Sequence, residues 1–100
     1  MYGTVARVRV LPGKEQALMD FGEQLARDYD PASGQVADYV FKLDQGKNEY
    51  IIVALFNDRE SYHRNAQAPE TDRQYQMMRE LLAADPEWND GEVVQENHYT

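Results

Sequence analysis

The sequence contains no cysteine, and this absence excludes several kinds of chemistry. Disulfides, thiolate nucleophiles and cysteine-ligated zinc all need that side chain. Basic residues are also scarce, because 10 lysines and arginines face 18 acids and the formal net charge is -8. Nucleic-acid phosphates require a basic face, so we expect no nucleic-acid partner. No apolar run could span a bilayer and no signal pattern opens the chain, so we expect no membrane association and a cytoplasmic location.

The length and composition are typical of a single globular domain, which we expect to cover residues 1–100. Strand-like alternation and helix-like apolar stripes predict an α+β fold with the order β-α-β-β-α-β. The second helical region is predicted as two pieces, the first capped by Asn57. The predicted strands cover 3–11, 35–44, 48–56 and 92–99. The predicted helices cover 14–29, a short stretch ending near 67, and 69 to 83 or 84.

The predicted third strand is apolar on both faces. One face carries Ile51, Val53 and Leu55, and the other carries Tyr50, Ile52, Ala54 and Phe56. The helices can cover only one face of a four-stranded sheet, and nothing else in the chain is available for the other face. We therefore expect a homodimer in which two sheets pack against each other. The alternative is a large exposed apolar patch on a monomer.

Three segments together carry a family resemblance. The first strand ends in Pro12-Gly13, residues 54–62 read Ala-Leu-Phe-Asn-Asp-Arg-Glu-Ser-Tyr, and the next helix ends in Ala66-Gln67-Ala68-Pro69. In this order and spacing, the chain resembles the antibiotic biosynthesis monooxygenase family of dimeric α/β-barrel proteins. The resemblance spans essentially the whole chain. It implies a ferredoxin-like four-stranded antiparallel sheet, a barrel shared by two subunits, and a cleft between sheet and helices.

Members of this family oxidise polycyclic phenols without metal or flavin, degrade heme, isomerise small molecules, or have no known activity. The resemblance therefore implies a fold and leaves the reaction open. Where the family commonly has a tryptophan, two histidines and a first-strand asparagine, this chain has Phe56, Asn65, Glu70 and Ala6. The tryptophan, the histidines and the asparagine are hallmarks of the heme-degrading members, and all are missing at these positions of this chain. We therefore expect no heme, no other cofactor and no metal site.

The chain has seven tyrosines, and several fall on faces that would line the implied cleft. The predicted cleft residues are Tyr50, Phe56, Tyr62, Asn65 and Tyr75. An aromatic cleft with a few polar groups suits a flat organic ligand. Asn65 and Tyr62 share a helix face and are the best catalytic candidates, because an amide can donate to a developing phenolate. The alternative is that these aromatic residues simply fill the core. His63 is expected to be exposed.

Arg7 and Arg9 should face away from the helices, on the side of the predicted dimer barrel. We expect them to form structural ion pairs there rather than to clamp a substrate. The available acids are Glu49, Glu92 and Glu96. The other predicted barrel residues are Ile51, Val53 and Leu55.

The leading hypothesis is a homodimer that binds a small, largely apolar, aromatic or quinol-like molecule and acts as a cofactor-independent monooxygenase. A non-catalytic dimeric ligand-binding or stress-associated protein is one alternative, and a small-molecule isomerase is another. The sequence leaves open whether the protein is an enzyme.

Overall fold

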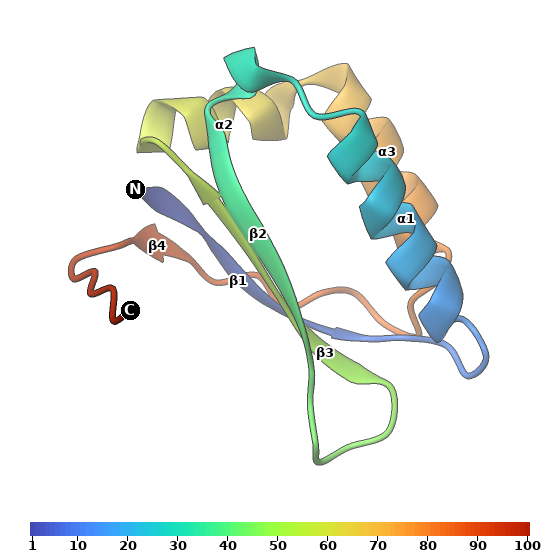
Figure 1. Cartoon of the computed structure of the whole chain (residues 1–100). Helices are drawn as coiled ribbons and strands as arrows, with labels where there is room; N and C mark the ends of the chain where they lie inside the picture. The colour runs from blue at the N-terminus through green and yellow to red at the C-terminus, as the bar shows by residue number, and fades with distance from the viewer.

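The computed structural model describes residues 1–100 and confirms the predicted α+β fold (Figure 1). The strands are β1 (Tyr2–Arg9), β2 (Gln35–Lys42), β3 (Glu49–Phe56) and β4 (Asp90–Glu92). The helices are α1 (Glu15–Arg27), α2 (Arg59–Gln67) and α3 (Pro69–Arg79), with a 3₁₀ turn at Pro31–Ser33.

The four strands form one antiparallel sheet in the order β2-β3-β1-β4. The central pair, β1 and β3, is in register over its whole length, from Tyr2 opposite Phe56 to Arg9 opposite Glu49. All three helices lie on one face of this sheet (Figure 1), as in the ferredoxin-like arrangement. We call the face under the helices the inner face and the opposite one the outer face.

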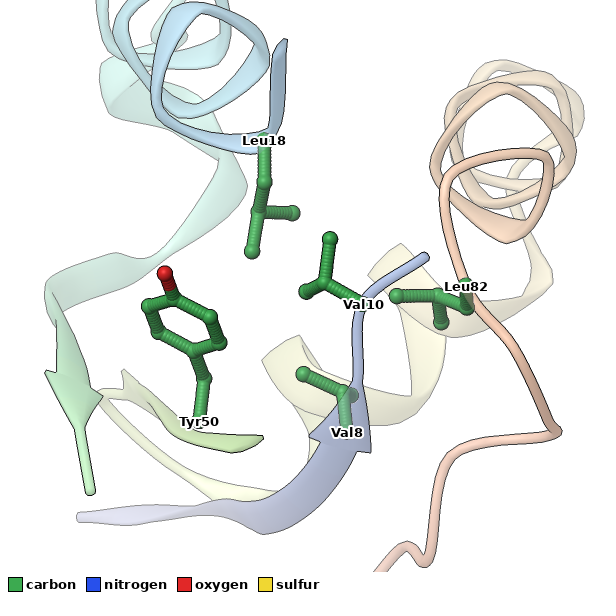
Figure 2. Close-up of a cluster of buried hydrophobic side chains, with 5 residues drawn as sticks. All are labelled: Val8, Val10, Leu18, Tyr50 and Leu82. Atoms are coloured by element: carbon green, nitrogen blue, oxygen red, sulfur yellow. The ribbon is translucent and has the colours of Figure 1, made fainter. Parts of the chain in front are cut away.

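The core lies between the inner face and the helices. Alternate residues of β1 and the position after it point inward and are buried; these are Thr4, Ala6, Val8 and Val10. Val8 and Val10 pack with Leu18 of α1, Tyr50 of β3 and Leu82 in one hydrophobic cluster (Figure 2). Period-two burial along β1 thus matches the alternation of its sequence.

The outer face has no cover within the chain. Tyr39 and Phe41 on β2 are 54% and 55% exposed, and Val5 on β1 is 46% exposed. The strand registers place Val53 between Val5 and Tyr39, and Ile51 beside Phe41. These side chains form a continuous apolar surface across three strands. Monomeric proteins rarely expose such a surface without a use for it.

Helix α3 ends at Arg79, whereas the sequence predicted an end at 83 or 84. The reason is that the following residues pair with the chain just after β1. The Leu11 amide donates to the Leu81 carbonyl at 2.9 Å, and the Ala83 amide donates to the Arg9 carbonyl at 2.8 Å. Leu82 thereby enters the core as a bridge to Val10 instead of extending the helical stripe.

The last strand was also predicted in the wrong place. It covers Asp90–Glu92 rather than 92–99. The chain already runs beside β1 from Leu82 onward, and the Val93 amide donates to the Met1 carbonyl at 2.9 Å. Beyond that point β1 has no residues left to pair with, so residues 94–99 lack a strand partner in their own chain. Figure 1 shows this segment leaving the sheet.

The start of α2 differs from the prediction by one residue. The Asp58 carboxylate accepts a hydrogen bond from the Ser61 amide at 2.7 Å, so Asp58 caps the helix instead of Asn57. This bond also holds the pKa of Asp58 below its ordinary value. The backbone N–H of Asn57 donates to the Gly34 carbonyl at 2.8 Å, which ties the end of β3 to the start of β2.

Candidate functional site

The structure divides the five predicted cleft residues among separate environments. Tyr50 and Phe56 both face inward from β3 and are only 4% and 3% exposed. They are six positions apart along the strand, which corresponds to about 20 Å. Tyr50 belongs to the cluster around Val8, whereas Phe56 contacts Tyr62 on α2, with ring centroids 5.5 Å apart. Tyr50 and Phe56 therefore lie in different parts of the core.

The space beneath α2 is filled by packed aromatic rings. The Tyr62 ring lies 5.3 Å from that of Tyr2, and both contact the ring of His63. We call Tyr2, Phe56, Tyr62 and His63 the α2 aromatic cluster. His63 is half-buried within it, so the prediction that it would be exposed is wrong. Tilted and edge-on contacts between aromatic rings at these distances stabilise packing in a protein core.

The hydroxyl group of Tyr62 is fixed by β4. It donates to Oδ1 of Asp90 at 2.8 Å. Burial, reinforced by this bond to a carboxylate, raises the pKa of Tyr62 to about 12. Tyr62 is therefore a neutral hydrogen-bond donor at physiological pH. Its donor is directed to Asp90, so in this arrangement it is not available to a substrate.

The two remaining cleft residues, Asn65 and Tyr75, lie on α2 and α3. Asn65 is half-buried, and its side-chain amide has no hydrogen-bond partner within the chain. The ring of Tyr75 lies 6.1 Å from that of Trp88. Tyr75 therefore packs on the segment leading into β4, while Asn65 keeps free donors and an acceptor.

Tyr50 combines a buried ring with a free hydroxyl. Its ring packs against Val8, Val10 and Leu18 on the β2 side of the core (Figure 2). Its hydroxyl makes no hydrogen bond in the chain. The single fully buried side-chain oxygen without a partner is Oγ1 of Thr4, so the Tyr50 hydroxyl retains contact with solvent.

The uncovered part of the inner face lies on β2, next to Tyr50. Asp38, Val40 and Lys42 point to this face, opposite Ala54, Ile52 and Tyr50 of β3. All three are exposed, and Val40 is 42% exposed. We call these three residues the inner strip. Helix α1 lies above this part of the sheet and buries only Leu18 completely, which leaves the strip accessible.

The sequence contains a signal for the inner strip that the prediction did not use. Tyr39 and Phe41 alternate with Asp38, Val40 and Lys42 along β2. If the aromatic pair faces outward, the other three must face the helices. Because two of these three residues, Asp38 and Lys42, are charged, the helices should cover this part of the inner face only partly.

Arg7 and Arg9 form the predicted ion pairs on the outer face. Their Nη2 atoms lie 2.8 and 3.2 Å from the two carboxylate oxygens of Glu49. Hydrogen bonds from both guanidinium groups lower the pKa of Glu49. Neither Glu92 nor Glu96 takes part. A hollow of about 220 Å³ beside these groups is also lined by Asp85 and Glu87.

A second hollow, of about 160 Å³, lies on the outer face between Val5, Leu55 and Val93. No group of three or more histidine and acidic side chains is close enough to hold a metal ion. None of the helices combines the length and the hydropathy of a membrane-spanning segment.

The sheet order and the placement of all helices on one face define a ferredoxin-like α+β fold. Comparison with solved structures supports this fold. SnoaB, a cofactor-independent oxygenase from Streptomyces nogalater, superposes with a TM-score of 0.79 at 17% identity, covering 95% of this chain and 94% of SnoaB. Several other similar structures carry the name antibiotic biosynthesis monooxygenase.

Two further similar structures have names without an activity. A conserved protein from Methanosarcina mazei Go1 has a TM-score of 0.77 at 18% identity, covering 90% of this chain and 89% of its own. A protein of unknown function from Nitrosomonas europaea has a TM-score of 0.76 at 19% identity, covering 99% and 94%. No family model and no curated protein matches the sequence. At identities this low, the structural likeness establishes the fold alone, and function must be argued from the site.

Proposed function

We propose that this protein is a homodimer joined through the outer faces of two sheets. The observation that supports the dimer is the exposed apolar surface around Tyr39 and Phe41. Covering it with the same surface of a second copy buries both at once and satisfies two-fold symmetry. Packing of aligned sheets at about 10 Å also suits side chains of this size.

We further propose that each subunit binds a small, largely apolar, aromatic or quinol-like molecule between the helices and the inner face. The observation that carries this proposal is the inner strip, which leaves Val40 exposed beside the free Tyr50 hydroxyl. Small-molecule sites combine apolar walls with a few polar groups, and the strip provides both. The structural likeness to SnoaB, which is a cofactor-independent oxygenase, supports a reaction that needs no cofactor.

The proposed reaction is oxygenation of the bound phenol or quinol without a cofactor. A phenolate is electron-rich enough to react with O₂. One oxygen atom enters the ring to give a quinone, the other leaves as water, and the phenol supplies the electrons. The protein would hold the phenolate and donate hydrogen bonds to its oxygen. Asn65 and the Tyr50 hydroxyl have donors free for this purpose, whereas the hydroxyl of Tyr62 is engaged by Asp90.

One observation favours a second candidate, a dimeric protein that binds a ligand without transforming it. The α2 aromatic cluster takes up two of the five predicted cleft residues, Phe56 and Tyr62, in side-chain packing. Of the predicted cleft residues, Tyr50, Asn65 and Tyr75 then remain to act on a substrate, and they lie on three different elements. In this case the inner strip would bind a ligand, and no turnover would follow.

The experiment is a screen of polycyclic phenols and quinols for oxygen uptake and for a thermal shift. Wild type is compared with Asn65→Ala and with Asn97→Ala, a control in the exposed C-terminal segment. If Asn65 takes part in catalysis, oxygen uptake should be lost in Asn65→Ala and kept in Asn97→Ala. Both variants should melt at the same temperature as wild type. A thermal shift without oxygen uptake would favour the binding protein. A lower melting temperature for Asn65→Ala would instead identify Asn65 as a structural residue.

A further inference from the structure

Lys42 occupies a position on the inner face that the proposed reaction does not yet use. It is the last residue of β2 and lies directly opposite Tyr50 in the antiparallel register. Residues paired in this way share a sheet face, with Cβ atoms about 5 Å apart. The Lys42 ammonium group can therefore reach the neighbourhood of the free Tyr50 hydroxyl.

Lys42 has no acidic partner in the chain, and it makes none of the ion pairs of the structure. The one acid on the same face of β2 is Asp38, which lies four residues from Lys42, or about 13 Å along the strand. Glu49, its neighbour across the hairpin, points to the outer face and is held by Arg7 and Arg9. An unpaired cation thus lies near the apolar side chains of Val40 and Ile52, in a chain whose net charge is -8.

We propose that Lys42 binds an anionic oxygen of the ligand, with the Tyr50 hydroxyl as a second hydrogen-bond donor to the same group. The aromatic ring would then lie against Val40 and Ile52, which are paired across β2 and β3. The inference rests on the proposed binding function. It specifies the ligand class as an aromatic molecule with a carboxylate or an acidic phenol, rather than a neutral hydrocarbon.

The physical basis is the pairing of charge with an apolar contact. A charge-assisted hydrogen bond from an ammonium group to an anionic oxygen is stronger than a neutral one. An exposed pair is screened by solvent, so we expect the charge to contribute roughly a fivefold preference in affinity. Contact with Val40 and Ile52 would supply the remaining affinity for both charged and neutral ligands.

The test uses two probes of almost the same shape, 2-naphthoate and its uncharged methyl ester. Their binding is followed by NMR, through the resonances of Val40 and Ile52, in wild type, Lys42→Gln, Lys42→Arg and Lys47→Gln. Lys47 lies in the exposed turn after β2 and serves as the control. We expect wild type to prefer the carboxylate about fivefold. The preference should vanish in Lys42→Gln and persist in Lys42→Arg and Lys47→Gln.

Two negative outcomes are distinguishable. If both probes shift the Val40 and Ile52 resonances with equal affinity, or if Lys42→Gln keeps the preference, the role of Lys42 is overturned while the binding strip survives. If neither probe shifts these resonances in wild type, the proposed binding function itself is overturned, and the inference about Lys42 is overturned with it.

Discussion

Tyr62 illustrates how one residue can satisfy a sequence motif and still play a different part in the structure. Its position on the inner side of α2 matched the expectation for a catalytic donor. Asp90 occupies that donor, and Tyr2, Phe56 and His63 surround the ring. The sequence could not reveal this because Asp90 was predicted to precede the last strand instead of starting it. Tyr50, expected to line the same cleft as Phe56, lies six positions away from it on the same strand.

The raised pKa of Tyr62 predicts a specific dependence of stability on alkaline pH. The folded pKa is about 12, against an ordinary value of 10.0. As pH rises the unfolded chain ionises first, so the stabilisation by the Tyr62–Asp90 bond is complete below about pH 10 and is lost between about 10 and 12. Tyr62→Phe should cost about 0.5–1.5 kcal/mol at neutral pH. Urea unfolding of both proteins at pH 7 to 11.5 measures the difference, which should shrink at the alkaline end. A constant difference would contradict the assignment.

At the scale of elements, local pattern predicted the central strands well and the last quarter of the chain poorly. The hairpin of β2 and β3 follows from period-two alternation and a glycine turn, which are properties of adjacent residues. The ends of α3 and β4 depend on pairing with β1, which lies about eighty residues earlier in the chain. Leu81 and Leu82 continue the helical stripe in the sequence. In the structure, however, the Leu81 carbonyl accepts from the Leu11 amide, and the Ala83 amide donates to the Arg9 carbonyl. Such long-range competition is invisible to periodicity.

The cap of α2 provides a test at this scale, because the sequence favoured Asn57 and the structure identifies Asp58. Asp58→Ala removes the carboxylate that accepts from the Ser61 amide, and an unsatisfied helix N-terminus lowers stability. We expect the melting temperature to fall by a few degrees, measured by circular dichroism at neutral pH. Asn57→Ala, the adjacent control, should change it much less. The reverse ranking of the two variants would restore Asn57 as the cap.

At the scale of the whole molecule, the charge distribution and the apolar surface act together. A net charge of -8 makes two copies of the protein repel each other at long range. The centre of the outer face carries no charge, because Arg7, Arg9 and Glu49 pair with one another at one end. Two copies that associate through this face would therefore meet little electrostatic repulsion within the interface. Added salt should strengthen the association, because it screens the long-range repulsion between the two negatively charged copies.

The dimer is tested by one substitution placed on either face of the same strand. Light scattering at micromolar concentration should give wild type a mass about twice 11.6 kDa. Tyr39→Glu puts an unpaired charge into the proposed interface twice, once from each copy, so it should shift the population to monomer. Tyr39 is 54% exposed in the single chain, so this variant should still fold. Val40→Glu places the same charge on the inner face and should remain a dimer. A wild-type mass of 11.6 kDa would refute the dimer, and equal dissociation by both variants would show that the outer face is not the interface.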